Sequence, residues 1–327
     1  MSKPVSDVSV AVVIPSYRVK AQILGVISSI GPEVQKIYVV DDACPEQSGE
    51  FVRAQSRDPR VEVLFNEKNL GVGGAMIAGY RRAIADGVDY VVKMDGDGQM
   101  DAKRISALLF PLVTKISDYT KGNRFYRFPY LRTMPWVRIF GNAVLNFFSK
   151  VSSGLYAISD PTNGFTAIST KVLGELSFEK LSNRYFFESD MLYQLASLGA
   201  VVWDVPMPSR YGEEKSSMRV GFIVPEFLIR HSTNLFKRIC YQYFLRDFTV
   251  ASVQLVLAIP ALVFGAVFGG YHWWRSYETG VFTPTGTVIL AAFSVAVGIQ
   301  LFLGFLSFDM ADRRTLPLQC RLPDGPR

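Results

Sequence analysis

At residues 90–99 the chain reads Tyr-Val-Val-Lys-Met-Asp-Gly-Asp-Gly-Gln, and this stretch decides the fold class that we expect. A short apolar run with β-branched residues predicts a buried strand, and it stops at two carboxylates one residue apart. Asp95 and Asp97 point the same way if the backbone stays extended, because side chains alternate faces along a strand. Convergent carboxylates repel each other unless a cation lies between them, and oxygen-rich sites suit Mg²⁺ or Mn²⁺. The alternative is a solvated acidic turn.

The residues before this stretch alternate between strand-like and helix-like segments. Strands are expected over residues 8–15, 36–42, 61–66 and 88–94. Helices are expected over residues 21–30, 46–57 and 73–86. Alternation of this kind predicts an α/β fold with a mostly parallel, Rossmann-like sheet and helices on both faces.

Polar residues follow each expected strand at the point where it ends. In such sheets ligands bind outside the carboxyl ends of the strands. The clusters that fall there are Pro15-Ser16-Tyr17, Asp41-Asp42, Asn69-Leu70-Gly71 and Asp95-Gly96-Asp97. We therefore expect one binding rim built from four loops.

The apolar residues concentrate at the C-terminal end of the chain. The formal charge is +6, yet 49% of the residues are hydrophobic, which argues against a soluble nucleic-acid-binding protein. Residues 250–271 and 285–308 carry no charged side chain. Each is roughly 20 residues long, enough to cross a hydrocarbon core of about 30 Å as a helix. We predict two transmembrane helices; the alternative is a pair of buried core helices.

The flanking charges predict the orientation of these spans. Lys237, Arg238 and Arg246 precede the first span, and four arginines follow the second, whereas the connector carries Arg275 balanced by Glu278. Positive residues favour the cytoplasmic side, so we expect the N-terminal domain and the tail there, in a multi-pass protein of the cell membrane. An aromatic belt is expected in the connector at Trp273, Trp274 and Tyr277.

Other composition features exclude some classes. The polar stretch after Met1 does not resemble a signal peptide. Three scattered cysteines form no metal or disulfide pattern, which fits a reducing compartment. His231 and His272 are the chain's two histidines and are far apart in sequence, so a histidine-based zinc site or triad has little support.

Two further segments combine aromatic and basic residues. Residues 125–160 have this character and include an expected apolar helix, and residues 222–244 look similar. Each could be core or could lie in the headgroup layer of a membrane, and we interpret the second as an interfacial helix. The expected domains are 1–220 (catalytic), 221–247 (interfacial), 248–310 (two spans) and 311–327 (cytoplasmic tail).

Seven short motifs occur in an order that has a known counterpart. They are Val13-Ile14-Pro15-Ser16-Tyr17, Val39-Val40-Asp41-Asp42, Asn69-Leu70-Gly71, Met94-Asp95-Gly96-Asp97-Gly98-Gln99, Gly122-Asn123-Arg124-Phe125, Asp160-Pro161-Thr162-Asn163-Gly164-Phe165 and Tyr211-Gly212-Glu213-Glu214-Lys215-Ser216. This series resembles family 2 glycosyltransferases, and its last three motifs resemble the dolichol-phosphate mannosyltransferase-like branch, which uses polyprenyl phosphates. The resemblance covers roughly residues 8 to 220. Departures are Ala43-Cys44 for Gly-Ser, Asn123 for Ser and Gly96 for Ala.

The resemblance implies a GT-A fold, a nucleotide-sugar donor and a divalent metal ion. Asp97 is then the direct ligand of Mg²⁺ or Mn²⁺, with Gln99 and Asp95 nearby. The donor-binding residues that it implies are Pro15, Tyr17, Asp41, Asp42, Asn69, Gly71, Asp95, Gly96, Asp97, Arg210 and Lys215. Asp41 has the alternative role of capping the helix that follows the second strand.

The resemblance also implies an acceptor site for a polyprenyl phosphate. Arg124 and Arg138 would hold the acceptor phosphate, with Asn142, since a guanidinium fork suits bidentate contact. The alternative for Arg138 is a headgroup contact at the membrane. Glu188 or Asp190 would lie near the sugar and the attacking oxygen, although a carboxylate in the first turn of a helix also stabilises that helix.

The implied reaction is inverting transfer of one sugar from a UDP- or GDP-linked donor to undecaprenyl or dolichyl phosphate. One alternative is a processive polysaccharide synthase, whose typical Gln-x-x-Arg-Trp motif is absent from the sequence. A second is a non-catalytic nucleotide-sugar-binding scaffold. The glycines at Gly71, Gly73 and Gly74 superficially resemble a dinucleotide fingerprint, but they open the third helix of the alternation rather than the first. The sugar, the nucleotide, the pathway and a homo-oligomeric state are left open.

Overall fold

The computed structural model describes residues 8–126, 136–208, 220–311 and 314–323, with the backbone alone at 136–138 and 220–224. The chain forms two compact units. One comprises Met1–Leu235 together with Arg314–Arg327, and the other is Phe236–Arg313. The C-terminal tail therefore groups with the N-terminal region.

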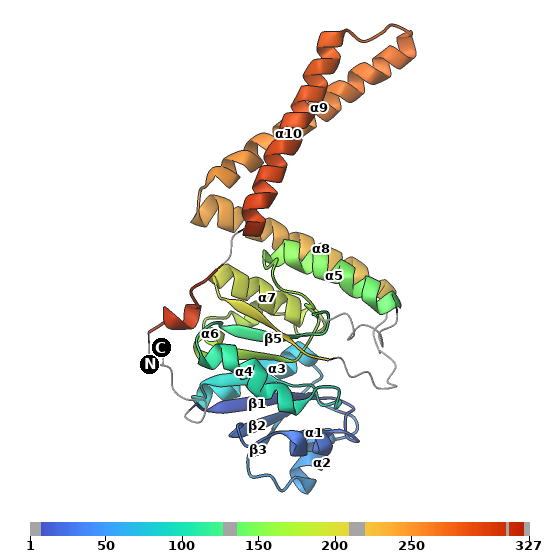
Figure 1. The fold of residues 1–327 in the computed structure, drawn as a ribbon. Helices are drawn as coiled ribbons and strands as arrows, with labels where there is room; N and C mark the ends of the chain where they lie inside the picture. The colour runs from blue at the N-terminus through green and yellow to red at the C-terminus, as the bar shows by residue number, and fades with distance from the viewer. Residues whose placement is uncertain (1–7, 127–135, 209–219, 312–313, 324–327) are drawn as a thin grey trace. The chain divides into compact units, whose positions relative to one another are not determined.

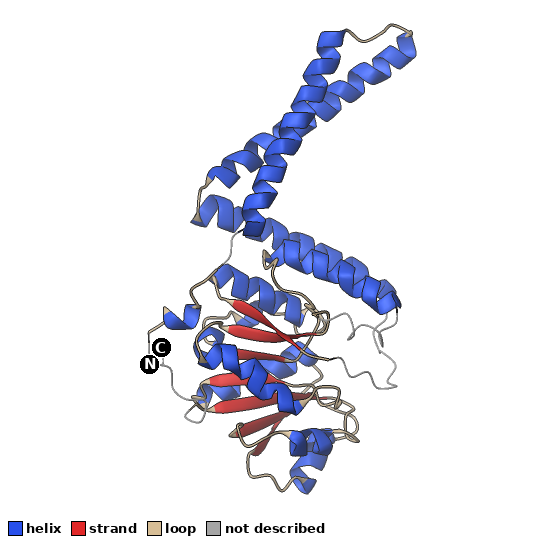
Figure 2. Cartoon of the chain, in the orientation of Figure 1, coloured by secondary structure: helices blue, strands red, loops and turns tan. Residues whose placement is uncertain are grey.

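A seven-stranded sheet forms the centre of the first unit (Figures 1 and 2). Its strands are β1 (Val10–Ser16), β2 (Lys36–Asp41), β3 (Val61–Phe65), β4 (Tyr90–Lys93), β5 (Tyr119–Asn123), β6 (Thr166–Ser169) and β7 (Val202–Pro206). Their spatial order is β3-β2-β1-β4-β6-β5-β7. The predicted strands are confirmed, and so is the mostly parallel sheet.

Strand β6 departs from the parallel arrangement. It pairs antiparallel with both β4 and β5, whereas β5 and β7 are parallel. The chain leaves β5 at the carboxyl-end rim and returns to the same rim before β6, so β6 must run the other way. The consequence is functional: the loop after β5 and the loop before β6 meet beside the end of β4.

Helices cover both faces of the sheet because alternate strand residues point to opposite sides. The helices of this unit are α1 (Ile23–Ser29), α2 (Ser48–Gln55), α3 (Val72–Ala85), α4 (Ile105–Val113), α5 (Trp136–Ser153), α6 (Thr170–Leu173) and α7 (Phe187–Leu198), with short turns η2 (Ala102–Arg104) and η4 (Phe178–Lys180). Val12 and Ile14 of β1 join the core under α1 and α4, and Ala11 and Val13 join the core under α3 and α7.

Helix α8 (Val220–Cys240) continues into a π-helical turn, η5 (Tyr241–Arg246). The helix expected over residues 222–244 is thus present. It exposes apolar side chains, including Ile229 and Phe236 at 68% and 72%. Its placement at a membrane surface stays a prediction.

The second unit contains two long apolar helices, α9 (Val250–Thr279) and α10 (Thr285–Ala311). Both are long and apolar enough to cross a membrane, and 28% and 11% of their most apolar windows are buried within the chain. Such low burial disfavours the alternative of core helices. The helices approach closely at Gly265 and Gly298, where an added Cβ would lie 2.6 Å from Val295 and 2.7 Å from Leu262.

The expectation that the aromatic belt lies in the connector is wrong. Trp273, Trp274 and Tyr277 belong to α9, which continues to Thr279 and ends at Gly280, whose φ of 68° suits a helix C-cap. Helical hydrogen bonding continues past the last fully apolar turn because a polar helix surface is tolerated there. The connector is therefore a few residues long.

A buried ion pair ties α8 to the end of α10 within the second unit. Arg238 donates to both carboxylate oxygens of Asp309, at 2.6 and 2.8 Å, and the Tyr243 hydroxyl donates to the same group at 2.8 Å. The side chains of Arg238 and Asp309 are 5% and 2% exposed. A bidentate charged pair of this kind fixes direction as well as distance.

The C-terminal tail packs on the N-terminal part of the first unit. The backbone amides of Leu318 and Gln319 each donate to the Asp118 carboxylate at 2.7 Å, at the start of β5. The Gln319 side chain donates to the carbonyls of Leu112 and Ser117. Burial raises the pKa of Asp118, and the tail amides oppose that effect. Residues 200 positions apart thus complete one buried hydrogen-bond set.

Candidate active site

The paired aspartates lie in a turn directly after β4. The backbone amide of Gln99 donates to Oδ1 of Asp97 at 3.0 Å, which closes the turn. A cavity of about 120 Å³ opens here. Asp95, Asp97 and Gln99 line one side of it, and the loops around β5 and β6 line the other through Arg124, Thr162 and Asn163.

The residues of this turn fit a divalent metal ion that is shared with a phosphate. Within the described residues, no group of three or more His, Cys, Asp and Glu side chains could hold a metal by itself. Two carboxylates and one amide are nevertheless hard oxygen donors beside an open cavity. Mg²⁺ is typically bound in this way, through one or two carboxylates plus substrate phosphates.

Gly96 and Gly164 leave room at the two sides of the site. A Cβ at Gly96 would lie 3.0 Å from Val19 and 3.1 Å from Ile23, so a larger residue here would crowd these two side chains. A side chain at Gly164 would collide with the Lys93 ammonium and lie 3.0 Å from Asp95. Both glycines therefore permit close approach rather than an unusual backbone angle.

Lys93 is a buried charge under the aspartate turn. Its side chain is 2% exposed, and its Nζ lies 3.0 Å from Asp95 and 3.2 Å from Glu188. Burial alone would lower the pKa of Lys93, but the two carboxylates outweigh it and raise that pKa. The ammonium is therefore a permanent positive charge between β4 and α7.

Of the two acidic candidates in α7, Glu188 reaches this cluster and Asp190 does not. Asp190 is 8% exposed. Its carboxylate accepts hydrogen bonds from the Ser182 amide and hydroxyl, at 3.0 and 2.6 Å, and from Asn234 of α8 at 3.3 Å. Asp190 thus holds the loop before α7 and one turn of α8, whereas Glu188 is the carboxylate of α7 that contacts Lys93.

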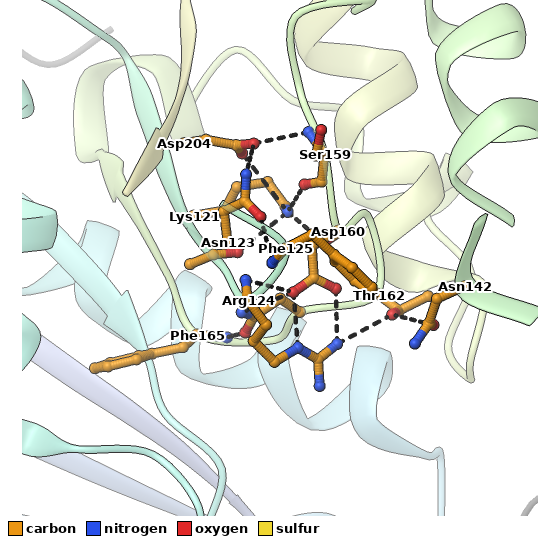
Figure 3. Close-up of polar contacts among 12 residues, drawn as sticks. Lys121, Asn123, Arg124, Phe125, Asn142, Ser159, Asp160, Thr162, Phe165 and Asp204 are labelled. Carbon is orange, nitrogen blue, oxygen red and sulfur yellow. Dashed lines mark hydrogen bonds and ion pairs between the residues drawn. The ribbon is translucent and has the colours of Figure 1, made fainter. Parts of the chain in front are cut away.

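Arg124 is held by a carboxylate of the chain itself (Figure 3). Its Nε and one terminal nitrogen each lie 2.7 Å from an oxygen of Asp160, and its backbone amide donates to the same group. Asp160 is fully buried with a φ of 55°, a left-handed conformation that costs free energy in a residue other than glycine. Although burial opposes it, the arginine holds the pKa of Asp160 below its ordinary value.

A second buried lysine supports the same loop. Lys121 of β5 donates to the carbonyls of Ser159 and Asp160 and lies 3.8 Å from Asp204 (Figure 3). Burial lowers the pKa of Lys121 and raises that of Asp204 to about 6. Asp204 also accepts from Asn123 and from the Ser159 amide. These contacts fix the loop that presents Arg124.

The carboxylates of Asp41 and Asp42 are engaged by the backbone. Asp41 accepts from the amides of Cys44 and Gly49, at 2.7 and 2.5 Å, and so caps α2, as in the alternative stated for it. Asp42 accepts from the amides of Leu70 and Gly71, at 2.9 and 2.7 Å. Both residues are buried, with 4% and 3% of their surface exposed. They hold the loops after β2 and before α3 in place.

The remaining donor candidates lie on the same rim. Pro15 is in β1, Tyr17 follows it with 42% of its side chain exposed, and Asn69 donates to the Asp42 carbonyl. Gly71 has a φ of 90°, and an added Cβ would lie 2.7 Å from the Asn183 carbonyl, so this position requires glycine.

The other acceptor candidates are only partly described. Asn142 of α5 accepts from the Thr162 hydroxyl at 3.4 Å, and Thr162 also lies 3.5 Å from Arg124 (Figure 3). Arg138 lies in α5, and its side chain is outside the described part of the chain. Arg210 and Lys215 fall outside the described residues altogether.

Comparison with known proteins decides the family. The model for glycosyl transferase family 2 matches residues 11–177, just over half of the chain. The chain belongs to glycosyltransferase family 2. The resemblance drawn from the seven motifs is therefore confirmed.

Named relatives of this family 2 glycosyltransferase act on lipid phosphates, according to their names. It is similar to the undecaprenyl-phosphate mannosyltransferase of Micrococcus luteus, with 30% identity over 227 residues that cover 67% of this chain and 91% of that protein. It is also similar to the UDP-N-acetylglucosamine–dolichyl-phosphate N-acetylglucosaminyltransferase of Methanococcus voltae, with 25% identity over 235 residues that cover 66% and 93%.

Solved structures show that this family 2 domain has the GT-A fold. One is glucosyl-3-phosphoglycerate synthase from Mycobacterium tuberculosis in complex with UDP, with a TM-score of 0.51 and 20% identity over 70% of this chain and 80% of that one. Another is mannosyl-3-phosphoglycerate synthase from Rubrobacter xylanophilus, with a TM-score of 0.52 and 18% identity over 74% and 77%. The expected GT-A architecture is thus confirmed.

A second, larger cavity of about 600 Å³ lies beside the start of α3 in this glycosyltransferase. The loop before α7 and the first half of α8 line it with both charged and aromatic side chains, including Arg184, Phe186 and Arg230. Arg230 donates to Ser182 at 2.7 Å and to Glu226 at 2.9 Å. The lining of this cavity shares no residue with that of the cavity at the aspartate turn.

His231 joins α8 to α5 and to the loop before α7. It is 3% exposed, its Nδ1 lies 2.8 Å from the Ser152 hydroxyl, and its ring contacts Phe186 at a centroid distance of 4.8 Å. Burial lowers the pKa of His231 from 6.5 to about 4. The histidine is therefore neutral in the folded protein at physiological pH.

We expect acid to destabilise this glycosyltransferase through His231. Between pH 6.5 and about 4 the unfolded chain binds the proton and the folded one does not, so stability falls as pH falls through this window. The shift corresponds to about 3 kcal/mol. His231→Gln should flatten the dependence of Tm on pH between 4 and 6.5, whereas His272→Gln, at the other histidine, should keep the wild-type slope. Equal slopes in all three proteins would contradict the assignment.

Sequence reasoning did not find four residues that organise this active site. Lys93, Lys121, Asp160 and Asp204 form the buried ion pairs beneath Asp95 and Arg124. The sequence does contain one indication of such a pair. Lys93 is a charged residue inside an otherwise apolar strand, and a charge in a buried strand requires a partner. Of its two partners, Asp95 is two residues away, whereas Glu188 lies nearly a hundred residues away in α7.

Proposed function

We propose that this family 2 glycosyltransferase transfers one sugar, with inversion, from a nucleotide-sugar donor to a polyprenyl phosphate at the cytoplasmic face of the membrane. One observation carries the proposal: the Asp95–Asp97 turn and Arg124 face each other across a single cavity. Carboxylates suited to a metal–diphosphate complex and a cation suited to a second phosphate are thereby adjacent. Similarity to the undecaprenyl-phosphate mannosyltransferase supports the acceptor class.

The donor side would use the rim that follows β1 to β4. Asp97 and Gln99, with Asp95 beside them, would hold Mg²⁺ or Mn²⁺. When bound, the metal would neutralise the charge that develops on the departing nucleotide diphosphate. Similarity to a synthase crystallised with Mn²⁺ and UDP-glucose agrees with this use of a metal.

The remaining donor candidates would contact the nucleotide or close over it. Pro15 and Tyr17 would contact the base and ribose, and Asn69, Gly71 and Gly96 would border the diphosphate and sugar. Asp41 and Asp42 would act by holding these loops, since their carboxylates accept backbone amides. Arg210 and Lys215 are proposed to cover the donor phosphates, as the family resemblance implies.

The acceptor side would use the loops around β5 and β6. Arg124, Arg138 and Asn142 would bind the lipid phosphate, which is anionic near neutral pH and attacks the anomeric carbon without a strong base. Asp160 orients Arg124 and leaves its guanidinium edge at the cavity. Glu188 would border the sugar, while Asp190 would hold the α7–α8 contact.

The protein would be anchored in the membrane that holds its acceptor. The two apolar helices α9 and α10 are each long enough to cross a bilayer and are joined by a short connector, as in a membrane hairpin. The flanking arginines and lysines favour the cytoplasm for the N-terminal region and the tail.

The proposal is tested with purified protein, a panel of UDP- and GDP-sugars, and undecaprenyl phosphate. We expect one nucleotide sugar to release nucleoside diphosphate only when both lipid phosphate and Mg²⁺ or Mn²⁺ are present. Mass spectrometry should find one sugar per lipid, and NMR should find the anomeric configuration opposite to that of the donor. Nucleotide-sugar binding without turnover would instead indicate a scaffold, and chains of several sugars would indicate a processive synthase.

A further inference from the structure

Two buried lysines occupy one row of the sheet beneath the active-site rim. Lys93 of β4 and Lys121 of β5 both pair in register with Thr166 of β6, which lies between them. Their side chains are 2% and 1% exposed. Burying two ammonium groups is costly unless each is paired, so each has its own set of acceptors. The acceptors of Lys93 differ from those of Lys121, which indicates that the two lysines have different roles.

Lys121 supports a loop, whereas Lys93 faces the aspartate turn. Lys121 donates to the carbonyls of Ser159 and Asp160. Lys93 contacts two carboxylates on different elements, Asp95 after β4 and Glu188 in α7. Gly164 keeps space for its ammonium group, because a side chain there would collide with Nζ.

We propose that Lys93 is a positioning residue that engages Asp95 and lowers the affinity of the aspartate turn for its divalent cation. The proposal rests on the proposed function in one respect, namely that this turn binds the metal. Asp95 Oδ1 is paired with the ammonium at 3.0 Å, so a cation in the turn would have to share the Asp95 carboxylate with Lys93. The positive charge of the Lys93 ammonium, in direct contact with Asp95, also repels any cation that binds in the turn.

A weakened metal site has a chemical use. The metal must leave with, or be released from, the nucleoside diphosphate after each transfer, so a site that binds it too tightly would retain the product. Glu188 completes the arrangement because it neutralises part of the Lys93 charge. Lys93, Asp95 and Glu188 thus form one charged cluster directly beneath the turn.

The test measures Mn²⁺ binding directly, by calorimetry with purified full-length protein in the presence of UDP or GDP and without acceptor. Lys93→Met should tighten Mn²⁺ binding at least tenfold, because Asp95 and Glu188 lose their counter-charge. Glu188→Gln should weaken Mn²⁺ binding severalfold, because Lys93 is then less neutralised. Lys36→Met serves as the control, because it removes a lysine that pairs with Asp86 at the end of β2 opposite the rim, and it should leave the Mn²⁺ affinity unchanged.

The opposite changes in Mn²⁺ affinity expected for Lys93→Met and Glu188→Gln distinguish this role from general damage to the site. Disruption of the fold would weaken Mn²⁺ binding in both Lys93→Met and Glu188→Gln, so parallel weakening would overturn the proposal. Unchanged affinity in Lys93→Met would overturn it as well. Should Lys93→Met not fold, Glu188→Gln and the charge-preserving Lys93→Arg decide, since the latter should keep Mn²⁺ affinity within about threefold of wild type.

Turnover measurements separate this proposal from the proposed function. Lys93→Met should lower kcat at least tenfold, with a smaller change in the KM for the nucleotide sugar, because product release slows as the metal is held more tightly. Lys93→Arg should rescue part of the loss. If the wild-type protein binds Mn²⁺ and nucleotide but transfers no sugar to any lipid phosphate, the proposed function fails, while the binding experiment still decides the role of Lys93.

Discussion

Replacing Asp97 with alanine should remove sugar transfer almost completely, lowering kcat/KM by on the order of 10³-fold. Asp97 lies in the turn closed by the Gln99 amide and lines the cavity that faces Arg124. Without the Asp97 carboxylate the turn would not hold the metal ion, and the departing diphosphate would lose the positive charge that stabilises it. The measurement is release of nucleoside diphosphate from the donor at saturating metal. Asp95→Ala should also be severe, partly through loss of the Lys93 contact.

Asp101 provides the matched control for this substitution. It lies four residues further on, lines the same cavity and accepts a hydrogen bond from the Lys103 amide at the start of η2. If activity depends on where the carboxylate lies rather than on the total negative charge of the cavity, Asp101→Ala should keep most of the activity. Full activity of the wild-type enzyme in excess EDTA, or of Asp97→Ala with added metal, would refute the metal assignment.

Replacing Arg124 with alanine should act on the acceptor rather than on the donor. An anionic headgroup must be held against an already anionic donor, and a guanidinium fork offsets that repulsion. We expect kcat/KM for undecaprenyl phosphate to fall by about 100-fold, with donor affinity changed less than about threefold. Lysine should rescue this loss only in part, because it cannot keep the two-point contact with Asp160. Arg138→Ala should behave alike.

Two further variants sharpen the Arg124 experiment. Asp160→Asn tolerates the left-handed backbone at this position but loses the ion pair, so it should show an intermediate loss of acceptor use. Arg184→Ala removes a guanidinium from the larger cavity and should leave acceptor kinetics unchanged. Calorimetry in which donor affinity falls as steeply as acceptor use in both Arg124→Ala and Arg138→Ala would assign these arginines to the donor instead.

Local patterns in the sequence predicted the parts of the fold that depend on local physics. Strand β4 and its aspartate turn, the preceding alternation and the two long apolar helices all follow from periodicity, length and turn residues over short windows. The antiparallel direction of β6 did not follow. It depends on where the chain re-enters the sheet after α5, which no local window contains.

The same limit explains the reassignments within the candidate site. The sequence allowed Asp41 either a ligand contact or a helix cap, and the structure shows that its carboxylate accepts the amides of Cys44 and Gly49, while a donor contact stays a prediction. Glu188 and Asp190 are equivalent by sequence, but two residues along a helix point in different directions. One therefore contacts Lys93 and the other contacts Ser182 and Asn234.

The docking of the tail on Asp118 has a consequence for biosynthesis. The ribosome releases β5 and its Asp118 about 200 residues before it releases the amides of Leu318 and Gln319 that satisfy this carboxylate. Until then the buried position of Asp118 lacks two of its hydrogen-bond donors. The catalytic unit can therefore reach its final structure only after both apolar helices have been synthesised, so its folding ends with the last residues of the chain rather than with its own strands and helices.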